Sequence, residues 1–258
     1  MNNSLAVAHV VLLEMIRRKD VYVLLFLTML ITLTLGSINL FGDERIARYL
    51  KEVCLTLIWL SSLIIAVTSA ARQIPTEKES RTIFPLLAKP ISRWEVLLGK
   101  FLGCWAASAL ALAAFYLFFG VLSGTREQHW PLVNYFQAWW LHVVFCAVVI
   151  ALTLLGSVQF SAVAANVTIV VSIVVGILLL GRHLHKVAVG TGGLAGRLLE
   201  VLYFSLPHLE WYDVRDLVIH NWPAIGWGVI AFDTLYGACY GGLFLLLAWL
   251  RFRRLTLN

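Results

Sequence analysis

Long apolar runs separated by short polar segments dominate the chain. A bilayer's hydrocarbon core, about 30 Å thick, is crossed by a helix of about 20 mostly apolar residues. Six runs are long enough, and they cover residues 21–41, 53–71, 101–122, 139–160, 161–181 and 224–250. The pattern predicts an all-α integral membrane protein with six transmembrane helices, in one transmembrane domain that takes in residues 1–258.

The residues before the first run have a different pattern. Leu5, Ala8, Leu12 and Met15 recur at helical spacing, with polar residues between them. Such spacing predicts an amphipathic N-terminal helix that lies in the membrane interface. The alternative is a cytoplasmic extension of the first transmembrane helix.

Composition agrees with lipid as the surrounding solvent. Hydrophobic residues make up 60% of the chain and charged residues 13%, whereas a soluble domain carries roughly 25% charged residues. The net charge of +6 does not indicate a nucleic-acid partner, because the basic residues lie between the apolar runs. The four cysteines fall in four different runs, which favours small buried side chains over a disulfide or a metal site.

Lysine and arginine are unevenly distributed between the runs. Six lie from Arg72 to Lys100, one lies in the segment 124–137, and three lie in the last eight residues. Because positive charge marks the cytoplasmic side, the 72–100 loop and the C-terminus are both expected to be cytoplasmic. An even number of helices must then separate them. We therefore expect the 139–181 stretch to turn at Gly156–Ser161, and both chain termini to be cytoplasmic.

The stretch from Thr76 to Lys100 holds eight of the 34 charged residues. Thr76 with Glu79, and Ser92 with Glu95, have the spacing of a helix capping box, which predicts two helix starts. The stretch exceeds the roughly 2–8 residues that a simple connection needs. It is therefore built to contact something in the cytoplasm, or else it is a solvated loop whose charges only set topology.

This stretch resembles the first cytoplasmic loop of type-2 ABC transporter permeases. In those proteins a glutamate and a threonine precede a Leu-Leu pair, then Pro-Ile/Val-Ser-Arg, then Gly-Lys. The matching positions are Glu79, Arg81, Thr82, Leu86, Leu87, Pro90, Ser92, Arg93, Gly99 and Lys100. Within the family the chain looks most like the permeases of multicopper-enzyme maturation systems.

The resemblance implies a function. In such transporters this loop is a coupling helix that docks on a separate ATPase subunit. Carried onto this chain, the partner-binding residues are Glu77, Lys78, Glu79, Arg81, Thr82, Pro85, Leu86, Leu87, Pro90, Ser92 and Arg93. The chain would then be the permease subunit of an exporter-type ABC transporter in the bacterial cytoplasmic (inner) membrane. It would pair with a second permease copy, identical or paralogous.

No catalytic residue is expected in this chain. A phosphate-binding loop needs Gly-x-x-x-x-Gly-Lys-Ser/Thr, but Gly99-Lys100 is followed by Phe101 and has no glycine five residues earlier. ATP and Mg²⁺ are therefore expected only in the partner ATPase. The alternatives are a secondary transporter without an ATPase partner, for which no internal repeat is found, and an intramembrane enzyme, for which no catalytic motif is found.

Residues 182–223 form an external segment between the fifth and sixth helices. The resemblance implies short re-entrant helices that gate the outer mouth; the alternative is a periplasmic cap that simply lies on the lipid. His183, His185 and His208 form a weak metal-ligand pattern that we do not favour.

A few polar residues fall inside the runs. Asp233 is a candidate pathway residue, but its place near the outer end of its helix favours contact with lipid headgroups. His142, Gln159 and Asn166 are expected to bond neighbouring helices or to lie at the interface.

Overall fold

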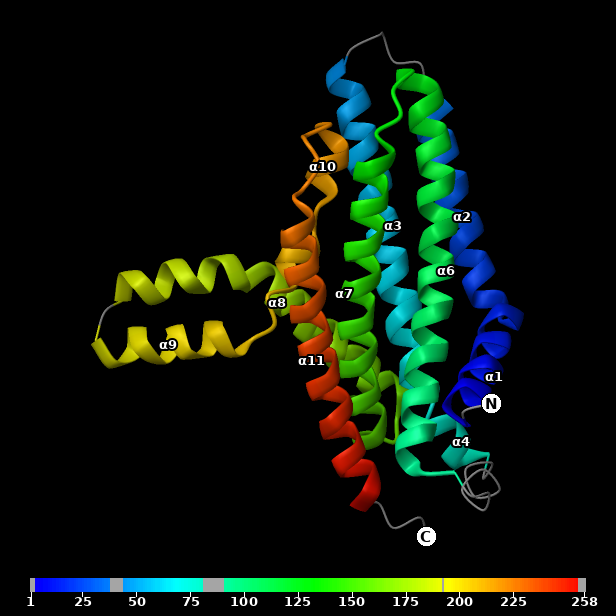
Figure 1. Ribbon diagram of the computed structural model, residues 1–258, viewed down its shortest axis with the longest axis vertical. Helices are drawn as coiled ribbons and strands as arrows, with labels where there is room; N and C mark the ends of the chain where they lie inside the picture. The colour runs from blue at the N-terminus through cyan, green and yellow to red at the C-terminus, as the bar shows by residue number, and fades with distance from the viewer. Residues whose placement is uncertain (1–2, 38–43, 81–90, 192, 255–258) are drawn as a thin grey trace.

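A computed structural model describes residues 3–37, 44–80, 91–191 and 193–254, and all regular structure there is helical (Figure 1). The helices are α1 (Asn3–Arg17), α2 (Lys19–Ser37), α3 (Glu44–Arg72), α4 (Pro75–Glu79), α6 (Arg93–Glu127), α7 (Leu132–Gln159), α8 (Val163–Thr191), α9 (Gly193–Ser205), the 3₁₀ turn η1 (Leu209–Tyr212), α10 (Arg215–Ile219) and α11 (Trp227–Arg254). The prediction of an all-α protein is confirmed for this part of the chain.

An upright bundle of long helices forms the body of the molecule (Figure 1). Helix α7 is its centre, because it packs against α3, α6, α8 and α11 and buries most of its side chains. Helix α1, helix α4 and the C-terminal end of α11 lie at one end of the bundle, and α10 lies toward the other end. The described chain, residues 3–254, therefore begins and ends at the same end of the bundle as α4, which agrees with the even number of crossings inferred from the distribution of charge.

Four helices in the described residues are long and apolar enough to cross a membrane, namely α3, α6, α7 and α11. The apolar parts of α2 and α8 are shorter, at Tyr22–Thr34 and Val163–Leu179. A multi-pass helical protein is thus supported, whereas the count of six transmembrane helices stays a prediction. The expected turn after Gly156 is confirmed, since α7 ends at Gln159 and α8 begins at Val163.

Helix α1 is separate from α2 and packs on the first turns of α6. Gly99 and Gly103 allow this close approach: an added Cβ at either position would lie 2.6 Å from the Cβ of Val7 or Val11. Glycines four residues apart are a common contact surface between membrane helices. The position of α1 in the membrane interface stays a prediction.

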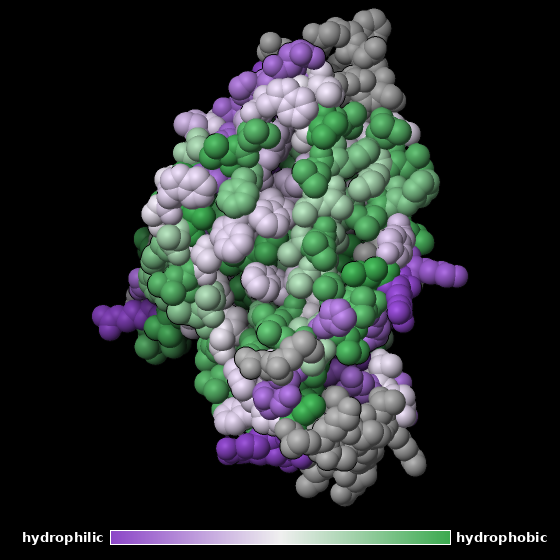
Figure 2. Space-filling view, turned by 45° about the vertical axis from the view of Figure 1, so that its right-hand side comes forward, coloured by the Kyte–Doolittle hydropathy of each residue, from purple (hydrophilic) through white to green (hydrophobic). Residues whose placement is uncertain are grey.

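Helix α8 leaves the bundle, and α9 returns beside it, so that the two form a hairpin that projects sideways (Figure 1). Large apolar side chains on the hairpin are exposed: Leu179, Val189, Leu194, Leu198, Val201 and Phe204. Apolar side chains also cover much of the middle of the bundle in Figure 2, while hydrophilic residues lie at its two ends and at the left and right margins near mid-height. This distribution fits a molecule surrounded by lipid at mid-height.

Candidate functional site

The short helix α4 is joined to the bundle by a buried lysine. The ammonium group of Lys100, on α6, donates hydrogen bonds to the carbonyl oxygen of Gln73 at 3.0 Å and to Oε1 of Glu77 at 2.6 Å. Lys100 is 2% exposed and the Glu77 side chain 29% exposed. A charge buried this deeply needs a partner of opposite sign, so this ion pair fixes α4 between the end of α3 and the start of α6.

The start of α4 differs from the predicted capping box. The residue before the helix is Ile74, which has no side-chain cap, and Pro75 occupies the first helical turn. Proline suits that position because its missing N–H has no partner there anyway and its φ angle is already helical. The prediction that Thr76 and Glu79 form a capping box is therefore wrong, and Pro75 provides the helix start.

The second predicted capping box is confirmed at the start of α6. The Ser92 hydroxyl accepts a hydrogen bond from the Glu95 N–H at 3.2 Å, and the Glu95 carboxylate accepts one from the Ser92 N–H at 2.7 Å. The same carboxylate accepts a bond from Nδ2 of Asn3 at 3.3 Å. Glu95 therefore completes the capping box of α6 and also holds the N-terminus of α1.

Arg93 connects the start of α6 to the end of α11. Its guanidinium donates to the carbonyl oxygens of Phe252 at 2.6 Å and Arg253 at 3.0 Å, and it lies 5.6 Å from the centre of the Phe252 ring. Carbonyls in the last turn of a helix lack partners within that helix, so a cation there is favourable. One end of the bundle is thus held together by contacts among α1, α4, α6 and α11.

The structure separates the predicted partner-binding residues into three groups. Glu77, Ser92 and Arg93 bond within the chain, as described above, while Lys78 is half-buried and Glu79 is exposed. Arg81, Thr82, Pro85, Leu86, Leu87 and Pro90 lie outside the described residues. Contact of any of these with an ATPase stays a prediction.

Sequence reasoning missed the residues that hold this end in place. The sequence pattern treats Gly99 and Lys100 only as a Gly-Lys motif, and it gives Gln73 and Asn3 no structural role. One signal was available: Lys100 stands directly before an apolar run, where a charge needs a partner. Which partner it takes depends on the fold, because Glu77 precedes it by 23 residues.

At the other end, Arg215 attaches the segment after α9 to α3. Arg215 binds Asp213 at 2.7 Å, donates to the Thr56 hydroxyl at 2.6 Å and lies 5.8 Å from the centre of the Trp59 ring. Burial alone would raise the pKa of the Asp213 carboxyl, but its hydrogen bonds with Arg215 and the charge of Arg215 hold that pKa below its usual value. The pair is therefore ionised at neutral pH.

Side chains of α7 hold the chain just before α11. Gln137 exchanges two hydrogen bonds with the backbone of Ile225, at 2.8 and 2.9 Å, and Asn134 donates to the Trp222 carbonyl at 2.8 Å. In addition, the Tyr212 hydroxyl donates to the backbone carbonyl of Asp233 at 2.9 Å. The interpretation of the whole external segment as lying on lipid is therefore wrong, because residues 209–225 pack on the bundle. A gating role stays a prediction.

Asp233 is more deeply buried than its place in the sequence indicated. Its side chain is 7% exposed, on the face of α11 toward the bundle. The expectation that it contacts lipid headgroups is therefore wrong: Tyr212 and the segment around it cover this part of α11. A role of Asp233 in a pathway stays a prediction.

The histidines lie in different surroundings. His208 is buried among aromatic rings, with the rings of Tyr203 and Trp211 at 4.4 and 4.8 Å between centres, and His183 is exposed. The described residues hold no group of three side chains placed to bind a metal ion.

Two intramembrane polar residues bond neighbouring helices as predicted. His142 on α7 shares a hydrogen bond of 2.6 Å with Ser62 on α3, and Asn166 on α8 donates to the Thr153 carbonyl on α7 at 3.1 Å. Gln159 is exposed at the end of α7, as an interface residue would be.

Comparison with known protein families identifies the family of the chain. The family model of the ABC-2 family transporter proteins matches residues 7–215, from α1 to α10. The chain belongs to the ABC-2 transporter family. It is therefore a multi-pass membrane protein and the permease subunit of an ABC transporter. No curated protein matches the chain, and the multicopper-enzyme maturation branch stays a prediction.

Proposed function

We propose that this ABC-2 permease subunit couples ATP hydrolysis by a separate ATPase subunit to export, or to a conformational change across the membrane. The ATPase docks on α4 and the loop that follows it. ATP and Mg²⁺ bind to the ATPase, and this chain contributes no cofactor site. A second permease copy, identical or paralogous, completes the membrane part in the bacterial cytoplasmic membrane, with both termini cytoplasmic.

The contact between Lys100 and Glu77 is the observation that carries this proposal. Helix α4 is only five residues long, and a helix that short is not stable alone. The buried ion pair makes it a firm projection from α3 and α6, so a displacement of α4 is passed on to both helices. On the far side of the loop, Arg93 ties the start of α6 to α11, which extends the same movement to a third long helix.

We expect the ATPase to recognise the charged side chains at the exposed side of α4. Lys78 and Glu79 are not among the residues that fix α4 to the bundle, and Glu79 is exposed. Complementary charges at an interface increase association rate and specificity. Exchanging these two charges would therefore disturb docking without disturbing the anchor.

A charge exchange tests the proposal. The variant carrying Lys78→Glu and Glu79→Lys keeps the net charge of the loop, so the topology signal is preserved. We expect reduced co-purification of the ATPase subunit and a reduced ATP hydrolysis rate in the complex. The matched control is Arg197→Glu with Glu200→Lys on α9, where both side chains are exposed.

The two variants separate the outcomes. Loss of the ATPase from the α4 variant, with normal recovery from the α9 variant, supports docking at α4. Equal ATPase recovery and equal hydrolysis in both variants would contradict it, and absence of any co-purifying ATPase would favour a secondary transporter.

A further inference from the structure

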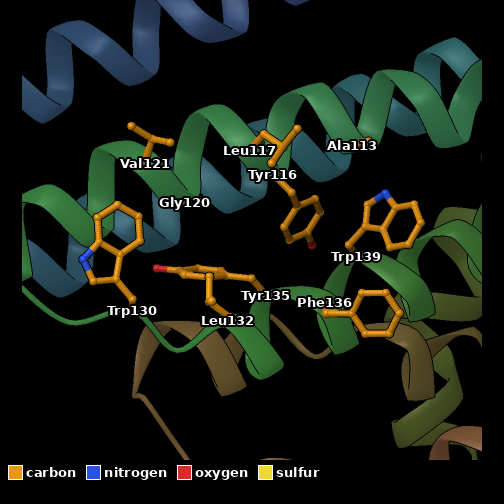
Figure 3. Close-up of a pocket in the computed structure, with 10 residues that line it drawn as sticks. All are labelled: Ala113, Tyr116, Leu117, Gly120, Val121, Trp130, Leu132, Tyr135, Phe136 and Trp139. Carbon is orange, nitrogen blue, oxygen red and sulfur yellow. The ribbon is translucent and has the colours of Figure 1, made fainter.

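An aromatic groove runs between the C-terminal half of α6 and the first turns of α7 (Figure 3). Its volume is about 350 Å³, which is within the roughly 300–1,000 Å³ that is usual for small-molecule sites. Both helices are long and apolar enough to cross a membrane, so the groove opens toward lipid. Five aromatic side chains line it: Tyr116, Trp130, Tyr135, Phe136 and Trp139.

The rings that form the walls are held by contacts with the rest of the bundle. The Trp130 ring rests directly on α6, because an added Cβ at Gly124 would lie 2.6 Å from it. The Tyr135 ring meets the Phe119 ring edge to face, with 6.1 Å between the ring centres. At Gly120 an added Cβ would lie 3.8 Å from the nearest atom of Tyr135, so α6 leaves the groove open at this position. The walls are therefore formed before any ligand arrives, and a ligand does not have to order them.

Two polar atoms of the lining have hydrogen-bond partners within the chain. The Tyr116 hydroxyl shares a hydrogen bond of 3.4 Å with Nδ1 of His142, whose side chain lies in the bundle core. The indole N–H of Trp139 donates to the Ala109 carbonyl at 3.4 Å. A strongly polar ligand would lose its hydration here without compensation. The groove therefore offers aromatic rings to a ligand.

The acyl chain of a lipid gains little by entering this groove. Lipid tails are as apolar as the lining, so the hydrophobic effect does not favour transfer from the bilayer into the protein. A flexible chain also loses conformational freedom when fixed walls hold it. What the groove offers and the bilayer does not is a set of fixed aromatic faces and edges. These prefer stacked or edge-to-face contact with another aromatic ring.

We propose that the groove binds a small, uncharged ligand with a flat aromatic ring system, which reaches it from the lipid. Figure 3 shows the rings of Tyr116, Trp130 and Tyr135 around the space that this ring system would occupy. The described lining carries no charged side chain, so a charged ligand would be buried there without a partner. The site goes beyond the proposed coupling function and does not involve α4, so binding is measured on this chain alone.

Photolabelling of the full-length chain in mild detergent tests the site. Benzophenone is an uncharged aromatic photoprobe, and mass spectrometry of peptides locates its adducts. We expect adducts within residues 113–121 of α6 and 132–139 of α7. At equal concentration, pyrene should reduce this labelling at least about tenfold more than perhydropyrene, its saturated counterpart, because each aromatic contact contributes about two- to tenfold. Hexadecanol, a single flexible chain, should leave the labelling unchanged.

Two variants separate the rings from the space between them. Trp130→Leu keeps an apolar side chain but removes a ring, so it should weaken competition by pyrene about threefold and leave perhydropyrene unaffected. Its control is Trp222→Leu, at a ring that is 54% exposed and outside the groove, which should change neither. Gly120→Leu fills the groove and should abolish labelling of both segments. Ala113→Leu fills the same groove and replaces Gly120→Leu if that variant does not fold.

Four results would overturn the proposal. Equal competition by pyrene and perhydropyrene would mean that the groove selects apolar volume alone, and strong competition by hexadecanol would make it a site for lipid chains. Undiminished labelling in folded Gly120→Leu and Ala113→Leu would place the ligand elsewhere. Labelling of the monomer but not of a dimer would assign the groove to a second copy of this chain.

Discussion

At the scale of single residues, the buried side chains of Lys100 and Asp233 differ in whether a partner of opposite charge is described for them. Lys100 has an oppositely charged partner at 2.6 Å, Oε1 of Glu77. Asp233 is also buried, but the one hydrogen bond described at this residue goes to its backbone carbonyl, from Tyr212. Burial of a charge is costly, and it is offset only where a partner is present. The two residues should therefore respond oppositely to neutralisation.

Lys100→Met is expected to destabilise the protein strongly. It leaves the Glu77 carboxylate partly buried without its cation, which costs on the order of 3–5 kcal/mol. Adding Glu77→Met replaces the ion pair by apolar side chains and should restore most of the stability. Thermal unfolding in detergent checks both, and a Lys100→Met protein as stable as the parent would show that the ion pair does not hold α4.

Asp233→Asn is expected to leave folding intact and to raise the unfolding temperature. The substitution removes the cost of a buried charge, and the bond from Tyr212 remains because it goes to the backbone. Glu200→Gln on α9, at an exposed carboxylate, is the control and should change nothing. A collapse of the folded fraction in Asp233→Asn alone would mean that the carboxylate has a bonding partner essential for the fold.

At the scale of elements, the sequence predicts the long helices well because apolar length is a local property. The run at 101–122 lies within α6, the run at 139–160 lies within α7 except for its last residue, Phe160, and the capping box at Ser92 has the predicted geometry. The start of α4 was misplaced because Pro75 and Thr76 both carry helix-start signals, and packing against the end of α3 favours the proline.

Elements that depend on long-range contacts could not be predicted. The attachment of residues 209–225 uses Arg215 with Thr56, and Gln137 with Ile225, which are pairs far apart in the sequence. The sequence alone does not determine whether the side chain of Gln137 faces solvent or another part of the chain. The same holds for the sideways course of α8 and α9, since their apolar residues fit lipid, protein or interface equally well.

At the scale of the whole molecule, the two ends of the bundle have different features. The end with α1, α4 and the last turn of α11 is fixed by Lys100, Glu95 and Arg93, and it carries the proposed ATPase dock. The opposite end carries the segment around Arg215 that is attached to α3. A permease that couples two sides of a membrane needs this separation, with long helices connecting the two ends.

The central claim is that an ATPase contacts α4, and site-specific photo-crosslinking tests it most directly. A photo-crosslinking amino acid replaces Glu79 on α4 in one protein and His129, exposed at the opposite end, in another. On illumination of the complete transporter in cells, the account predicts a covalent adduct with the ATPase subunit from position 79 and none from position 129. An adduct from position 129, or none from position 79 while the ATPase is present, would contradict it.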